Sequence, residues 1–429
     1  MREAFAGPLP EQGCAGLAAI EELVGLTEPG LASMTGPRFF GWVMGASHPV
    51  GVAADWLTSA WGQNCGGHTV TPAAAASEEA AARWLLDLLD LPTSASVGFA
   101  TGATVANVTC LAAARGELLR RVGWDVEGDG LFAAPPIRVI IGEEAHVSVF
   151  SALQFLGLGC NRVTRIPTDS MGRIKIDALA AAMEGDKGPT IVIVQAGHIN
   201  TGAFDPIGEI ADIAHRGNAW VHVDGAFGLW ARACAELAPL ACGLERADSW
   251  ATDGHKWLQL PYDCGFAIVR DAEAHRRAMA IVASYLPTAA ADERNPSHYV
   301  PELSRRARGF PAWAMIRALG RQGMARLVQH HCDIARRMAR ALGEESGIRI
   351  LNDVVLNQVA VRFGDDDLAT RRVIERLQAD GICFAAGAEW RGVWIMRLSV
   401  TSWATSEEDA DSSVAAILAA WRAVRAKAA

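Results

Sequence analysis

A lysine between tryptophan-bearing, largely apolar segments is the residue of this chain best suited to covalent chemistry. Lys256 lies in the run DGHKW at residues 253–257, and a strand is expected soon after it, at residues 265–269. An amine kept away from water is more readily neutral, and a neutral amine can form a Schiff base with a carbonyl group. The alternative is a surface lysine whose stem packs past Trp257 while its charge stays in water.

A histidine and an aspartate occupy alternate positions in the run WVHVD at residues 220–224. Alternate side chains of a strand share one face, so His222 and Asp224 point the same way, and Asp224 ends the strand, where open α/β sheets bind ligands. A carboxylate there needs a cation or a hydrogen-bond donor, although it could instead cap a helix or close the turn before Gly225. The pair could also hold a metal, but no third ligand lies at close spacing, so the sequence predicts no metal site.

Two further motifs suit an anion and a flat ring. The run GFATGAT at residues 98–104 leads into an expected helix from Val105, and its small residues, the helix N-terminus and the hydroxyls of Thr101 and Thr104 could hold a phosphate. It is neither a Walker A loop nor the dinucleotide fingerprint, and plain capping by threonine is the alternative. His146 follows an expected strand and could stack on a planar cofactor, or could simply pack or cap.

The order of these four motifs is more informative than any one of them. Along the chain come a phosphate-type loop, a histidine, an aspartate that ends a strand, and a lysine about 30 residues later. Pyridoxal 5'-phosphate (PLP) needs a helix N-terminus for its phosphate, a flat neighbour for its ring, a carboxylate for its ring nitrogen and a lysine for its aldehyde. Together the motifs indicate a PLP site.

The elements that must position these motifs alternate between strand and helix, which predicts an α/β fold with a mainly parallel central sheet and helices on both faces. The expected strands are 138–141, 190–194, 219–223 and 265–269, and the expected helices are 77–91 (with Ser77 as N-cap), 105–115, 147–156 and 207–216. A polar, proline-bearing stretch at 286–303 predicts a loop or lid. Then come a helix at 311–342, strands at 358–363 and 394–400, and helices at 367–380 and 406–427. The expected parts are an N-terminal arm (1–50), a large PLP-binding domain (51–300) and a small C-terminal α+β domain (301–429).

Composition limits the class of protein. Hydrophobic residues make up 51% of the 429 residues and charged residues 20%, which excludes a disordered chain and allows a large core. The net charge of −9 argues against nucleic acid or an anionic membrane as the main partner, and no apolar run is long enough to span a membrane. No signal peptide is visible, and nine scattered cysteines without a CxxC pair indicate reduced thiols, so a cytoplasmic enzyme is expected.

Several runs match those of one enzyme family. They are PRFFGW at 37–42, TP at 71–72, SEE at 77–79, HVS at 146–148, HVDGA at 222–226, HKW at 255–257 and SRRAR at 304–308. With these motifs the chain resembles the group II PLP-dependent amino-acid decarboxylases of fold-type I, the aspartate aminotransferase superfamily, over about residues 37 to 425. The resemblance implies a homodimer with its active site at the subunit interface and α-decarboxylation of an L-amino acid to an amine and CO₂.

The resemblance also implies a role for each matching residue. Lys256 would form the Schiff base with PLP, Asp224 would pair with the protonated pyridine nitrogen, and His146 would stack on the ring. Further cofactor contacts would come from Ala103 and Thr104 at the phosphate, from His255 nearby, and from Ala226 beneath the ring.

In this family a tyrosine on a mobile loop protonates the substrate carbon. Tyr299 lies in the polar loop just before the SRRAR run and is favoured, Tyr285 is its rival, and Tyr299 could instead only pack the closed lid. The chain departs from the family in GHI at 197–199, where the family has Gly-Thr-Thr. His198 there could hydrogen-bond the cofactor's 3-hydroxyl or the substrate, or be a benign replacement.

Four other residues bear on the substrate. The resemblance places Trp42 and Val43 in the pocket, brings Asn64 towards the site of the second subunit, and puts Arg397 where fold-type I enzymes often bind a carboxylate. Arg397 could equally form a structural salt bridge. His198 and Asn64 indicate a polar or acidic substrate side chain, whereas the 14 tryptophans leave an aromatic one open.

Two alternatives to decarboxylation stay open on the sequence. The same fold supports other PLP reactions, namely carbon–carbon lyase or aldolase cleavage, amino transfer and oxidative deamination. The other alternative is a PLP-fold protein without catalysis, and the intact Lys256 and Asp224 argue against it.

Overall fold

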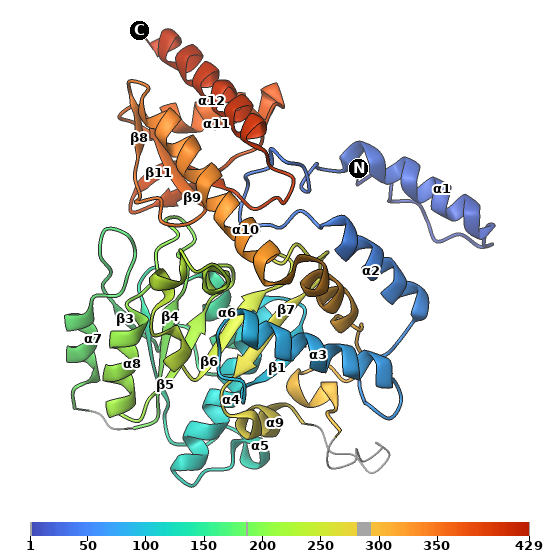
Figure 1. Ribbon diagram of the computed structural model, residues 1–429, viewed down its shortest axis with the longest axis vertical. Coiled ribbons are helices and arrows are strands. Elements are labelled where there is room, and N and C mark those ends of the chain that lie inside the picture. The colour runs from blue at the N-terminus through green and yellow to red at the C-terminus, as the bar shows by residue number, and fades with distance from the viewer. Residues whose placement is uncertain (1, 186–187, 281–292, 429) are drawn as a thin grey trace.

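Seven strands form the larger of two sheets in the computed structural model, which describes residues 2–185, 188–280 and 293–428 (Figure 1). They are β1 (Ser96–Ala100), β2 (Arg138–Gly142), β3 (Thr164–Ile166), β4 (Thr190–Gln195), β5 (Trp220–Asp224), β6 (Ser249–Asp253) and β7 (Gly265–Val269). Their order is β1-β7-β6-β5-β4-β2-β3, and the strands from β6 to β3 run parallel. β7 is antiparallel to both β6 and β1. The predicted mainly parallel sheet is confirmed.

Helices cover both faces of this sheet. The α-helices of this part of the chain are α2 (Pro49–Trp61), α3 (Pro72–Leu88), α4 (Ala103–Arg121), α5 (Val126–Asp129), α6 (Val147–Phe155), α7 (Ile176–Met183), α8 (Ile207–Arg216) and α9 (Ala272–Met279). In β4, Ile191 and Ile193 share a buried cluster with residues of α4 and α6, whereas Val192 and Val194 share another with residues of α3 and α8. Burial on both faces explains why such strands are continuous apolar runs.

Two predicted boundaries were wrong near the start of this lobe. α3 begins at Pro72, so Ser77 lies inside the helix, where its hydroxyl donates to the Ala74 carbonyl, and is not the N-cap. Proline suits the first turn because its missing N–H would be unpaired there anyway. Residues 98–100 belong to β1 instead of a phosphate loop, and a Cβ on Gly98 would lie 2.0 Å from the Tyr299 carbonyl oxygen. That close approach explains a glycine inside a strand.

The second sheet is antiparallel and has a core of its own. Its strands, in the order β10-β11-β9-β8, are β8 (Ile348–Ile350), β9 (Gln358–Phe363), β10 (Ala386–Trp390) and β11 (Val393–Ser399). It packs with α11 (Asp367–Asp380) and α12 (Glu407–Ala428). The long α10 (Gly309–Gly343) connects the two lobes: Met315 lies in the large-lobe core and Met338 in the small-lobe core (Figure 1). The predicted α+β lobe is confirmed.

The N-terminal segment lies apart from both cores at first and then joins one of them. α1 (Gly16–Thr27) buries none of its residues, and Figure 1 shows it standing away from the lobes. Phe40, further along, is fully buried in the small-lobe core. Throughout the described ranges, no helix combines the length and the apolar character needed to cross a membrane.

Candidate active site

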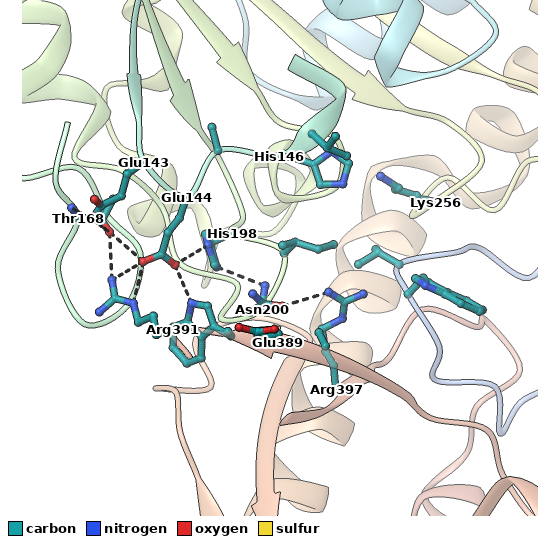
Figure 2. Close-up of a pocket in the computed structure, with 17 residues that line it drawn as sticks. Glu143, Glu144, His146, Thr168, His198, Asn200, Lys256, Glu389, Arg391 and Arg397 are labelled. Carbon is teal, nitrogen blue, oxygen red and sulfur yellow. Dashed lines mark hydrogen bonds and ion pairs between the residues drawn. The ribbon is translucent and has the colours of Figure 1, made fainter. Parts of the chain in front are cut away.

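A cavity of about 900 Å³ lies where the carboxyl ends of β2 and β4 face the hairpin of β10 and β11 (Figure 2). Lys256 and His146 border it from the large lobe and Arg397 from the small lobe. A smaller cavity beside it shares Lys256 and His146 and reaches Asp224. The two cavities bring together these predicted site residues: Trp42, Val43, His146, His198, Asp224, Ala226, Lys256 and Arg397.

Lys256 lies in the turn after β6 and points into the cavity (Figure 2). Its Nζ pairs with Asp253 Oδ2 at 2.8 Å, and 16% of its side chain is exposed. Trp257 is 1% exposed and donates its indole N–H to Nδ1 of His331, which belongs to α10. Because Trp257 is buried against α10 and the Lys256 ammonium is paired with a buried carboxylate, Lys256 is not a surface lysine whose charge stays in water.

A chain of hydrogen bonds orients Asp224 at the end of β5. Asn107 of α4 donates from Nδ2 to Asp224 Oδ2 at 3.5 Å, and the Ala226 N–H donates to Oδ1 at 3.2 Å. Asn107 donates through its NH₂ group, so its other side-chain atom, Oδ1, accepts a hydrogen bond from His222 Nε2, 2.9 Å away. A neutral imidazole that donates from Nε2 accepts at Nδ1, so His222 Nδ1 accepts from the Ser249 hydroxyl. Burial lowers the pKa of His222 to about 3, so the ring is neutral. With both ring nitrogens hydrogen-bonded, His222 orients Asp224 through Asn107.

His146 both caps a helix and borders the cavity. It is the N-cap of α6, where its Nδ1 lies 2.8 Å from the Ser148 hydroxyl. Its backbone N–H donates to Gln195 Oε1, which ties it to the end of β4. Burial lowers the pKa of His146, which favours the neutral ring. Capping and ring stacking are thus compatible, because the cap fixes the ring where it faces the cavity.

The N-terminus of α4 lies beside the lysine, as an anion site would require. The Ala103 N–H donates to Asp253 Oδ1 at 2.6 Å, and the other oxygen of this carboxylate pairs with Lys256. His255 is largely buried, and burial lowers its pKa. The Thr104 side chain is exposed. The sequence motif leads into this helix end, where a carboxylate that was not predicted accepts the Ala103 N–H.

Glu144 joins the two lobes across the mouth of the cavity (Figure 2). It accepts hydrogen bonds from Trp390 Nε1 at 2.6 Å, Thr168 Oγ1 at 2.9 Å and Arg391 Nε at 2.7 Å, and lies 3.3 Å from His198 Nε2. Burial alone would raise the pKa of Glu144, but these four partners outweigh it and lower the pKa to about 2. His198, predicted to contact cofactor or substrate, thus also holds this carboxylate.

Arg397 is a buried cation with few partners. It reaches the cavity from β11, is 7% exposed, and donates from Nη1 to Asn200 Oδ1 at 3.1 Å. Its Nε has no hydrogen-bond partner, and burial lowers the pKa of Arg397 to about 10. No acidic residue of the described chain forms an ion pair with it, so the structural salt bridge considered from the sequence is absent there.

Comparison with known proteins identifies the family. The profile of the pyridoxal-dependent decarboxylase conserved domain matches residues 9–363. The chain belongs to this decarboxylase family. An aromatic-L-amino-acid decarboxylase of Bacillus atrophaeus is 28% identical over 87% of this chain and 78% of its own length, and an L-2,4-diaminobutyrate decarboxylase of Rhizobium meliloti is 32% identical over 83% and 71%. A crystal structure of Oryza sativa TDC with PLP and tryptamine shares the fold, with a TM-score of 0.90 and 24% identity over 98% of this chain and 91% of that one.

Decarboxylation of an amino acid with PLP is therefore the reaction of this enzyme, and the other PLP reactions considered from the sequence are not supported. The site residues of the decarboxylase fit the cofactor. Asp224 is a buried carboxylate with no cationic partner among the described hydrogen bonds, and it shares a small cavity with Lys256 and His146. Such a carboxylate suits a protonated ring nitrogen.

Two predicted residues do not reach the cavity of their own chain. Tyr299, in the short helix η5 (Pro296–Tyr299), packs its ring on His275 at 5.2 Å between centroids, and the Arg294 guanidinium lies over the Tyr299 ring, 4.3 Å from its centre. Asn64 accepts from the Arg305 N–H at 3.0 Å and so ties this part of the decarboxylase to residues 304–306. Tyr285, the rival proton donor, lies outside the described residues.

Proposed function

We propose that this decarboxylase holds PLP between Lys256, Asp224 and His146 and breaks the bond from Cα to the carboxylate of an L-amino acid there. The supporting observation is that these three side chains, from three separate strand ends, border one small cavity. PLP, when bound, supplies an aldehyde and a protonated ring that accepts the electron pair left by CO₂. The most direct test incubates the protein with PLP and a panel of L-amino acids and measures CO₂ and amine. Amino transfer or aldehyde release without CO₂ would contradict the proposal.

Each of these side chains has a distinct task in the proposal. Lys256 binds the cofactor covalently and gives it up to the substrate amine. Asp224 keeps a proton on the ring nitrogen, because a buried carboxylate stabilises a positive charge next to it. His146 covers one face of the ring, with Ala226 on the other. The N-terminus of α4, with the Ala103 N–H, is the proposed place of the phosphate.

We further propose that Arg397 pairs with a second carboxylate, on the substrate side chain. Its guanidinium is buried, incompletely hydrogen-bonded and without an acidic partner in the described chain, so it is suited to an anion. A cation that held the departing carboxylate would stabilise the charged ground state more than the transition state and slow the reaction. An aromatic substrate is the second candidate, because Trp42 and Trp390 border the same cavity.

Substitution of Arg397 distinguishes these two candidates. For an acidic amino acid, we expect Arg397→Met to raise KM by about 10- to 100-fold, the loss of one charge-assisted hydrogen bond. The KM of any uncharged amino acid that is turned over should change much less, and Arg397→Lys should restore part of the affinity. Steady-state measurement of CO₂ release gives KM and kcat separately. An equal effect on every substrate would show that Arg397 does not select the side chain.

The proton donor is expected to be a tyrosine other than Tyr299. The Tyr299 ring is already packed on His275 and Arg294, and phenylalanine keeps this ring and loses only the hydroxyl. Tyr299→Phe should therefore change kcat by less than about threefold. Tyr285→Phe should lower kcat by about 10²- to 10⁴-fold, the range for a lost general acid. Single-turnover CO₂ and amine measurements on both variants check this. A large loss in Tyr299→Phe alone would restore Tyr299 as the donor, reaching the site of a partner subunit.

The quaternary and cellular setting is also proposed here. A homodimer would give the exposed apolar side chains of α1, such as Leu17, Ile20 and Leu23, a protein surface to pack against, and would let Asn64 approach the partner's site. A cytoplasmic location is supported by nine free cysteines and a net charge of −9.

A further inference from the structure

The carboxylate of Asp253 lies at the N-terminus of α4, the end of a helix that attracts anions. Its Oδ1 accepts a hydrogen bond of 2.6 Å from the Ala103 N–H and lies 3.5 Å from His255 Nε2. Its Oδ2 lies 2.8 Å from Lys256 Nζ, and only 4% of the side chain is exposed. The helix end proposed for the phosphate and the lysine proposed for the aldehyde are therefore linked by one buried carboxylate.

Positive charge is scarce around Asp253. Burial lowers the pKa of His255, which favours the neutral ring. The turn at residues 101–104 contains no lysine or arginine, and Lys256 is the cation paired with Asp253 within the described residues. A phosphate at the same helix end would need the Ala103 N–H that Asp253 already uses. It would also bring a second negative charge to within a few ångströms of the first, which is unfavourable in a site with little water.

We infer that Asp253 competes with the cofactor phosphate for the N-terminus of α4 and thereby sets how tightly this decarboxylase holds PLP. The inference rests on the proposed placement of the phosphate at Ala103. In the free protein the carboxylate takes the place of the phosphate, satisfying the Ala103 N–H and balancing the charge of Lys256. Binding of PLP requires Asp253 to release this N–H. Asp253 is thus a positioning residue. It reduces the contribution of the phosphate to the affinity of the protein for PLP, because the phosphate must displace its carboxylate from the Ala103 N–H.

The test compares PLP with pyridoxal, which has the same ring and aldehyde but no phosphate, on the apoprotein. Both compounds need Lys256, so any effect of residue 253 on the lysine is common to both and cancels in the ratio of their Kd values. We expect Asp253→Asn to raise the ratio of the pyridoxal Kd to the PLP Kd at least tenfold. Inorganic phosphate should also compete with PLP at lower concentrations in this variant. Quenching of tryptophan fluorescence reports all these affinities without any measurement of activity.

Matched variants separate this role from a structural one. Asp212→Asn removes the same charge from the exposed face of α8, where Asp212 pairs with Arg246, and should leave the ratio unchanged. Asp253→Ser removes the charge in a smaller side chain and serves the same purpose if Asp253→Asn does not fold. A ratio that stays constant or falls in a folded Asp253 variant would overturn the inference. Failure of both PLP and pyridoxal to attach to the unaltered protein would instead contradict the proposed function.

Discussion

Replacing Lys256 by alanine is expected to lower CO₂ release more than about 10³-fold, because the variant loses both its covalent link to the cofactor and a group able to move a proton. The structure supports a large effect. Lys256 points into the cavity, its ammonium group is held by Asp253, and no other lysine lines either cavity among the described residues. PLP should still bind through its phosphate and ring, but without the absorbance band of a lysine-linked cofactor.

Borohydride reduction followed by peptide mass mapping gives an independent readout. The sequence has three other lysines, Lys175, Lys187 and Lys427, so the attachment site is easily assigned. The unaltered protein should gain the mass of the reduced cofactor at Lys256, and Lys256→Ala should gain it at no position. Lys175→Ala, at an exposed position, is the matched control and should behave as the unaltered protein. Retained turnover in Lys256→Ala would exclude the proposed attachment.

Asp224→Asn is expected to lower kcat by about 10²- to 10⁴-fold, corresponding to the roughly 3–5 kcal/mol lost when a buried charge pair is broken. The amide keeps the size of the side chain and one of its two acceptor oxygens, so it can retain the hydrogen bond from the Ala226 N–H or from Asn107 Nδ2 but not both, and the fold should be preserved. What it loses is the negative charge that keeps a proton on the cofactor's ring nitrogen. The electron pair left by CO₂ is then accepted less readily.

The Asp224 prediction separates chemistry from cofactor binding. After borohydride reduction, Asp224→Asn should still carry the cofactor at Lys256, whereas single-turnover CO₂ release should be slow. Asp212→Asn, with the same change on an exposed helix face, should keep full activity. If Asp224→Asn lost the cofactor but turned over normally once PLP was supplied in excess, the carboxylate would serve binding and not the reaction.

The central strands and several helices could be predicted from the sequence because local patterns decide them. β4 was expected at 190–194 and lies at Thr190–Gln195, and α8 and α11 lie where they were expected, since buried β-branched runs and amphipathic helices are local signals. β1 could not be predicted because its glycine reflects the backbone of Tyr299 passing close by, a contact between distant parts of the chain. α3 was placed too late because Pro72, and not Ser77, starts it.

The residues of the candidate site also divide into those that local sequence patterns mark and those that depend on contacts between distant parts of the chain. Lys256, Asp224 and His146 each belong to a short motif at a strand end, so their residue types and their order along the chain were sufficient to select them as candidate site residues. Glu144 and Arg391 were missed because they act through a contact between residues 247 positions apart, and no local pattern marks it. Tyr299 was favoured from its place before a basic run, whereas its ring packs on His275 in the folded chain.

The Glu144 contact between the lobes has a consequence for acid tolerance. Its carboxyl pKa is lowered from an ordinary value of 4.5 to about 2, so the hydrogen bonds stabilise the folded state fully above about pH 4.5 and are lost only as the pH falls through about 2. Across the range in which cells operate, the Glu144 carboxylate therefore keeps one charge state. A change of activity between pH 5 and 8 cannot then arise from titration of Glu144, and the contact that this carboxylate makes between the lobes acts as a fixed frame.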